Sequence, residues 1–246
     1  MTPCHERFTA PVIFGFNRTH GSSTSIHMNK QLLRSVALLI LIPVLLGAAS
    51  KNKISPEIAL KRLMDGNRRF VAEAITGPHR TAERRSEVAS NHAPFASILS
   101  CSDSRVPPEL LFDQGFGDLF VVRNAGNIED DIVLGSLEYG AEHLHAPLIL
   151  VLGHKSCGAV TAAVHGGNHN NHIDDVVNAI EPAVEAAKEQ HPGDVDAATR
   201  ANARLVARRL AEKSKILSHL IESGELKILA GYYDMDTGRV KLLSDE

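Results

Sequence analysis

Three short apolar runs in the middle of the chain alternate with amphipathic segments. The runs cover residues 95–100, 119–122 and 148–152 and show no polar alternation, which is typical of strands buried on both faces. Apolar residues recur at helical spacing between the runs, over 108–112 and 132–144. Strands that alternate with helices in this way predict a parallel sheet in an α/β domain.

Further helical patterns flank these runs. A Ser-Pro pair at 55–56 predicts the start of an amphipathic helix, because Ser caps the first turn and Pro suits the first helical position. The other predicted elements are a charged, exposed helix over 78–92, two long helices over 173–189 and 195–222, and a hairpin over 226–243. We therefore expect a single α/β domain with a mainly parallel central β-sheet flanked by helices, an N-terminal helical arm and a C-terminal β-hairpin.

The first part of the chain, residues 1–50, reads as a leader, and the domain is placed at 51–246. Over 29–50, a basic stretch, an apolar run and small residues follow in the order of a secretory signal peptide, with Met28 as its start. The apolar run is shorter than the roughly 20 residues that cross a bilayer. A buried helix would normally show a polar face, and this run has none. Residues before Met28 either result from a start codon assigned too far upstream or form an organellar leader.

We expect cleavage of this leader near Ala49 and a periplasmic or secreted protein with no stable membrane anchor afterwards. An organellar or cytoplasmic location is the alternative if the leader is not a signal.

Composition narrows the range of partners. The 246 residues carry a formal net charge of −3, so no strong positive field draws the chain to phosphate backbones. Aromatic residues make up only 4% of the chain and Trp is absent, so few side chains could stack on nucleic-acid bases. We expect no nucleic-acid partner.

The candidate chemistry lies where two of the apolar runs end. Cys101 follows the first run, and His154 and Cys157 follow the third. The carboxyl ends of neighbouring parallel strands share one edge of a sheet, so these residues should meet there. Two thiolates and one imidazole are a zinc ligand set, and three protein ligands leave the fourth position open, as in catalytic sites.

These cysteines allow two other interpretations. If the chain is exported without Cys4, the remaining pair could form a disulfide, but a disulfide gives no role to His154, Asp103 or Arg105. A purely structural zinc site would need a fourth protein ligand, which Asp103 could supply.

An acidic and a basic residue stand close to the first candidate ligand. Asp103 lies two residues after Cys101 and Arg105 two further, on the same side if the chain is extended there. We expect Arg105 to hold Asp103 through a bidentate contact, as an acceptor for water at the metal. An unpaired Asp103 could instead bind the metal and close the open position.

These motifs resemble the β-class carbonic anhydrases. Four blocks carry the resemblance in the order of that family, and the likeness extends over about 50–243. The blocks are Cys-Ser-Asp-Ser-Arg-Val-Pro-Pro-Glu at 101–109, Asp-Leu-Phe-Val-Val-Arg-Asn-Ala-Gly-Asn at 118–127, Glu-Tyr-Gly at 138–140 and His-Lys-Ser-Cys-Gly-Ala at 154–159.

The resemblance implies zinc-dependent, reversible hydration of carbon dioxide to bicarbonate, with one Zn²⁺ per chain and the ligands and Asp103–Arg105 dyad named above. It also implies a homodimer or larger homo-oligomer in which the early helical arm lies over the partner, although this helix could simply pack on its own domain. The implied carbon dioxide pocket consists of Val106, Phe120, Tyr139, Gly158 and His92, which stands where members with an open zinc often carry Gln.

Alternatives to this function are a hydrolase of the same fold acting on a small molecule such as carbon disulfide, and a catalytically inert zinc-binding protein. Proton release also needs a carrier. His169, in a loop rich in Gly and Asn, is a candidate, and a mobile polar loop without this role is the alternative.

Overall fold

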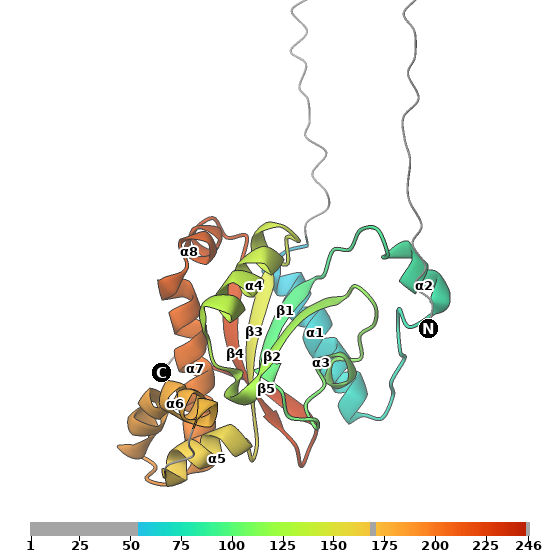
Figure 1. Cartoon of the computed structure of the whole chain (residues 1–246). Coiled ribbons are helices and arrows are strands. Elements are labelled where there is room, and N and C mark those ends of the chain that lie inside the picture. The colour runs from blue at the N-terminus through green and yellow to red at the C-terminus, as the bar shows by residue number, and fades with distance from the viewer. Residues whose placement is uncertain (1–53, 168–170, 245–246) are drawn as a thin grey trace, which may run out of the picture. The chain divides into compact units, whose positions relative to one another are not determined.

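The computed structural model describes residues 54–167 and 171–244. The expected leader and His169 lie outside these residues. The described chain is built on a five-stranded sheet with the strand order β2-β1-β3-β4-β5 (Figure 1), in which the first four strands are parallel and β5 is antiparallel to β4. The strands are β1 (Ala96–Cys101), β2 (Leu119–Asn124), β3 (Leu148–His154), β4 (Lys227–Asp234) and β5 (Arg239–Leu243). The predicted α/β class is confirmed.

Helices cover both faces of the sheet, which explains why its central strands are apolar throughout. In β3, Leu148, Leu150 and Leu152 pack with residues of α1 (Pro56–Val71) and α3 (Pro108–Leu111) on one face. Ile149 and Val151 point to the other face, towards α4 (Asp131–Glu142), α7 (Val195–Lys213) and α8 (Lys215–Glu222). A strand with cover on both sides has no position at which a polar residue would meet water.

Helix α1 packs against its own domain. The Ser55 side chain accepts a hydrogen bond from the Ile58 amide at 3.3 Å, as expected for the cap of this helix. Near its other end, the buried Asn67 side chain donates to the carbonyls of Leu111 and Gly238 and accepts from the Val240 amide. These hydrogen bonds fix α1 to the closing hairpin.

The charged segment after α1 contains a shorter helix than the predicted 78–92. Helix α2 (Ala82–Glu87) begins after the Thr81 cap and ends at Val88. The chain before it is not helical, because Gly77 and His79 have positive φ angles. It is held by the buried carboxylate of Asp113, which accepts hydrogen bonds from the amides of Thr76 and Gly77.

The long helix predicted over 195–222 is two helices, α7 and α8, which meet at Ser214. The Ser214 backbone is extended, and its hydroxyl accepts from the Leu217 amide while donating to Glu138 on α4. The other helices of this half are α5 (Gly158–His165) and α6 (His172–Lys188). Within the described residues, no helix combines the length and apolarity needed to cross a membrane.

Candidate metal centre

The candidate ligands meet at the carboxyl edge of the sheet. Cys101 is the last residue of β1, His154 is the last residue of β3, and these strands are paired neighbours. Cys157 is the residue immediately before α5. The structure therefore brings the three residues together from separate parts of the chain, through the parallel pairing that the strand pattern predicted.

The spacing of the three side chains suits one metal ion. Their candidate ligand atoms all lie within 4.8 Å of one another, and the two Sγ atoms are 4.0 Å apart. A disulfide would hold the sulfurs at about 2.05 Å. Two sulfurs bound tetrahedrally to one ion at about 2.3 Å each would be separated by about 3.8 Å. Both cysteines are free thiols, so the geometry supports a metal site and not a disulfide.

His154 presents a free lone pair to this site. The Nδ1 atom lies 3.0 Å from the Lys155 carbonyl oxygen, which can only accept, so Nδ1 carries the proton. The Nε2 atom is then an unprotonated acceptor, and it is buried without a hydrogen-bond partner among the described residues. A buried imidazole fixed by one hydrogen bond, with its other nitrogen unpaired, is the arrangement of a metal ligand.

The two thiols share a strongly polarised environment. A hydrogen bond from Cys157 lowers the pKa of Cys101 against the effect of burial, with a smaller contribution from the Gly126 amide at 3.4 Å. The pKa of Cys157 is raised by the same hydrogen bond and by burial. The pair therefore favours one thiolate, and a divalent cation would displace the proton that the two sulfurs share.

Asp103 and Arg105 form the expected bidentate pair beside the ligands. Arg105 donates from Nη2 to Oδ2 at 2.7 Å and from Nε to Oδ1 at 3.0 Å, and its backbone amide also donates to Oδ1. These side-chain hydrogen bonds lower the pKa of Asp103 to about 2 despite partial burial. The Oδ2 atom is 4.0 Å from Nε2 of His154, so the carboxylate lies beside the three ligands without joining them.

Two residues that support the site received no role from the sequence. Arg123 on β2 donates to the carbonyls of Cys101 and Asp103, at 3.0 and 2.6 Å, and so fixes the backbone that carries both side chains. Gly126 has a φ of 75°, and a Cβ there would lie 2.6 Å from Ile180. Both stand in the 118–127 block, and a charged residue at the end of an apolar run is a signal that could have identified Arg123.

The residues expected in the carbon dioxide pocket are divided between two places. Gly158 follows the candidate ligand Cys157 directly, and Val106 is buried in the core just beyond Arg105. Phe120 and Tyr139 are neighbours, with ring centroids 6.2 Å apart, but Phe120 pairs with Ser97, at the opposite end of β1 from Cys101. Four residues of strand correspond to about 13 Å.

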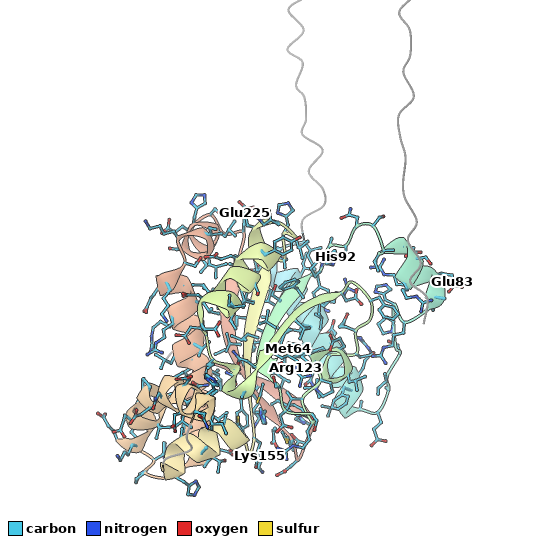
Figure 2. The ribbon with its side chains drawn as sticks, viewed as in Figure 1. Met64, Glu83, His92, Arg123, Lys155 and Glu225 are labelled. Carbon is cyan, nitrogen blue, oxygen red and sulfur yellow. The ribbon has the colours of Figure 1, made fainter. Side chains whose placement is uncertain are left out.

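His92 also lies at that opposite edge, where it lines a cavity with Phe95, His143 and His145. Figure 2 shows His92 at one end of the sheet and Lys155, which follows the candidate ligand His154, at the other. Within one chain, the structure therefore does not bring His92, Phe120 or Tyr139 to the metal ligands.

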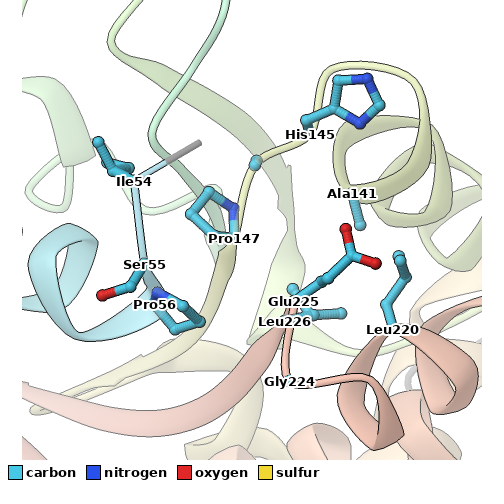
Figure 3. Close-up of a pocket in the computed structure, with 11 residues that line it drawn as sticks. Ile54, Ser55, Pro56, Ala141, His145, Pro147, Leu220, Gly224, Glu225 and Leu226 are labelled. Carbon is cyan, nitrogen blue, oxygen red and sulfur yellow. The ribbon is translucent and has the colours of Figure 1, made fainter. Parts of the chain in front are cut away.

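A smaller cavity of about 200 Å³ occupies the same edge as His92 (Figure 3). Ile54, Pro56 and Pro147 line one side, and Leu220 and Leu226 line the other. It contains none of the candidate ligands, so we assign it no part in the chemistry.

Comparison with known proteins points to one family. The family model described as carbonic anhydrase matches residues 96–240. Carbonic anhydrase 2 of Mycobacterium tuberculosis is 40% identical over 192 residues, which are 76% of this chain and 93% of that protein. The carbonic anhydrase of Mycolicibacterium smegmatis is 38% identical, over 77% of this chain and 94% of that protein.

Solved structures give the same likeness. The β-carbonic anhydrase of Coccomyxa in complex with acetazolamide has a TM-score of 0.58 at 28% identity, covering 75% of this chain and 86% of that one. A tetrameric β-carbonic anhydrase of Sordaria macrospora has a TM-score of 0.61 at 23% identity, covering 77% and 98%. The second likeness concerns the fold alone.

Proposed function

This chain belongs to the β-carbonic anhydrase family and catalyses the zinc-dependent, reversible hydration of carbon dioxide, and from that premise we propose how its own residues divide the work. Cys101, His154 and Cys157 hold the ion, and Asp103 with Arg105 orients the attacking water. The observation that carries this assignment is the unpaired, buried Nε2 of His154 within 4.8 Å of both sulfurs.

The bound zinc ion supplies Lewis-acid activation, which lets a water molecule lose a proton near neutral pH. The protein's part is to leave the fourth position open and to direct the lone pair of that water. Asp103 does this by accepting a hydrogen bond from the water, while Arg105 holds the carboxylate in place. Water and carbon dioxide then yield bicarbonate and one proton, which leaves for the solvent.

We propose that Asp103 stays hydrogen-bonded to Arg105 in the resting enzyme and does not occupy the open fourth position on the metal. The support is the pair of hydrogen bonds from Arg105, which uses both carboxylate oxygens. A pH profile of hydration by the zinc-loaded protein tests this. An open site keeps its activity at pH 7, whereas a collapse of activity below about pH 8 would show that Asp103 occupies the metal.

The two alternative functions make different predictions in the same assays. A hydrolase of carbon disulfide would consume that gas faster than it hydrates carbon dioxide, and stopped-flow measurements on both gases compare the two rates. An inert zinc protein needs a fourth ligand, and the candidate for it, Asp103, is engaged by Arg105. We expect hydration of carbon dioxide and no comparable turnover of carbon disulfide.

We propose that the homo-oligomer contains a dimer formed through the free edge of β2. The edge strand is only half-buried, and on the neighbouring α4 Ile132 is 80% exposed and Tyr139 50% exposed. Two β2 edges related by a two-fold axis perpendicular to the strands run antiparallel. The start of one β2, with Phe120, then lies against the end of the other, near the partner's ligands. Such a dimer would complete the pocket that one chain leaves divided.

Replacing the exposed apolar side chain on α4 tests this dimer. We expect Ile132→Asp to halve the particle mass in analytical ultracentrifugation and to lower kcat/KM about tenfold or more, because each pocket loses the partner's side chains. Ile173→Asp is the matched control, since Ile173 is 57% exposed but lies on α6. An Ile132→Asp protein with unchanged mass would refute the β2 interface.

We also propose that the protein is exported to the periplasm or secreted after removal of residues 1–50. The support is the order of basic, apolar and small residues over 29–50. Sequencing the N-terminus of protein purified from a cell's periplasmic fraction should show a start near residue 50. An intact Met1 or Met28 on protein found only in the cytoplasm would contradict export.

A further inference from the structure

A groove of about 580 Å³ lies between α6 and α7, and none of the candidate metal ligands lines it. Figure 1 shows the two helices next to each other at one side of the sheet. Sites for small organic molecules in proteins have volumes of about 300–1,000 Å³. The groove is therefore large enough to hold a small organic molecule.

The apolar part of the groove consists of small or aliphatic side chains without an aromatic ring. On α7, Ala197, Ala201 and Leu205 are four residues apart, so they form one apolar stripe along the helix. The wall on α6 is formed by Pro182, Ala183, Ala186 and Ala187. Such a surface suits the methylene groups of an aliphatic chain, and it offers no ring on which a flat heterocycle could stack.

A basic stripe runs beside this apolar stripe. Arg200, Arg204 and Arg208 also line the groove and are again four residues apart on α7, so they extend over about 12 Å of the helix. No carboxylate is among the described residues that line the groove. Glu181 and Glu185 of α6 line a separate cavity, between α5 and α6. The groove is therefore positively charged along its α7 side.

The three guanidinium groups keep donors for a ligand. Arg204 donates from Nε to the Ser244 carbonyl at 2.9 Å, which leaves the donors on both Nη atoms. Arg200 and Arg208 each lie 4.0 Å from a carboxylate of their own helix, and such long, solvent-exposed ion pairs stabilise little. Arg200 also lies over the Tyr232 ring, at 4.2 Å, and this contact uses the face of the guanidinium rather than the N–H donors at its edge.

We propose that the groove binds a linear aliphatic dicarboxylate. A planar guanidinium matches a carboxylate through two parallel hydrogen bonds, so one carboxylate binds Arg204 and the other binds Arg208. The methylene chain between them lies on the apolar stripe, at Ala201 and Leu205. Residues four apart on a helix are separated by about 6 Å, and extended adipate separates its two carboxylates by about the same distance.

Other anions match the two stripes less well. A polyphosphate would satisfy the basic stripe and leave the apolar stripe without a partner. A monocarboxylate with the same chain would leave one guanidinium unused, and a nucleotide would find no ring for its base. The site is independent of the metal centre and of the dimer proposed through β2, because the groove includes no residue assigned to either.

Calorimetric titration of adipate into the full, zinc-loaded chain at low ionic strength tests the proposal. We expect one adipate per chain with a Kd below about 1 mM. Arg204→Gln and Arg208→Gln should each raise this Kd about tenfold or more, because each removes charge-assisted hydrogen bonds. Arg85→Gln is the matched control, since it makes the same change at an exposed site on α2 and should keep the wild-type Kd.

Two further probes separate the contributions of charge and chain. Hexanoate has a similar aliphatic chain with a single carboxylate, and tripolyphosphate has several charges without the chain. Each should bind about tenfold more weakly than adipate or worse, because each engages only part of the groove. Binding of either probe as tight as that of adipate would overturn the assignment to a dicarboxylate.

A carboxylate could also bind the zinc ion, and the arginine variants distinguish that case. Zinc content and carbon dioxide hydration should stay within twofold of wild type in Arg204→Gln and Arg208→Gln, which shows that both variants are folded. Arg208 has no hydrogen bond to another element, so Arg208→Gln serves if the loss of the Arg204 contact with Ser244 unfolds the first variant. An unchanged Kd in Arg208→Gln, or no binding of adipate to the wild type, would overturn the proposal.

Discussion

Replacing the proposed ligand before α5, in Cys157→Ser, should remove the metal from the protein. A serine hydroxyl stays protonated near neutral pH and is a poor donor to zinc, which prefers thiolate and imidazole here. Only Cys101 and His154 would remain in the site. We expect zinc content after dialysis to fall from one per chain to below about 10%, and hydration activity to fall about 100-fold or more.

Cys4→Ser is the matched control for this loss. It makes the same chemical change at the third cysteine of the chain, which lies in the expected leader. Zinc content and activity should not change in that variant. Zinc measured by mass spectrometry after dialysis decides the outcome, and unchanged zinc in Cys157→Ser would remove Cys157 from the ligand set.

Much of the fold followed from local patterns in the sequence. The run over 148–152 predicted a strand with two covered faces, and β3 has Leu150 in one core and Val151 in the other. The position of the ligands followed from the same pattern. Because Cys101 and His154 each end a strand of one parallel sheet, topology alone places them at one edge.

The helix boundaries that were wrong depend on contacts between distant residues. The break at Ser214 is stabilised by a hydrogen bond to Glu138, 76 residues away, and no local pattern reveals that contact. The shortening of the predicted helix over 78–92 follows from Asp113, which holds the amides of Thr76 and Gly77. Periodicity measures local preference, and tertiary hydrogen bonds override it at such positions.

The site was less predictable where it depends on backbone contacts or, in the proposed dimer, on a second chain. Arg123 donates hydrogen bonds to the carbonyls of Cys101 in the neighbouring strand and of Asp103 in the loop after it. Such contacts to the backbone produce no characteristic residue spacing in the sequence. Phe120 and Tyr139 were expected beside the metal, but in one chain they lie at the other end of the strands. In the dimer proposed through β2, the second copy would bring them to the metal centre.

Removing the carboxylate beside the metal, in Asp103→Ala, should leave zinc in place and abolish most of the activity. None of the three proposed ligands changes, so zinc should remain at one per chain. The water at the open position would lose its acceptor, and Arg105 would lose the partner that holds it. We expect kcat/KM for hydration to fall about 10²- to 10⁴-fold, the range typical of a positioned acid or base.

The pairing of zinc retention with lost activity distinguishes this role from a structural one. Asp65→Ala is the matched control, because its carboxylate also pairs with cations, Lys61 and Arg68, but does so on the surface of α1. That variant should keep full activity. Arg105→Lys should lie between the two, since an ammonium group supplies charge without the planar, two-donor contact. Full activity in Asp103→Ala would mean that the metal centre orients its water without this pair, whereas loss of zinc would mean that Asp103 holds the ion.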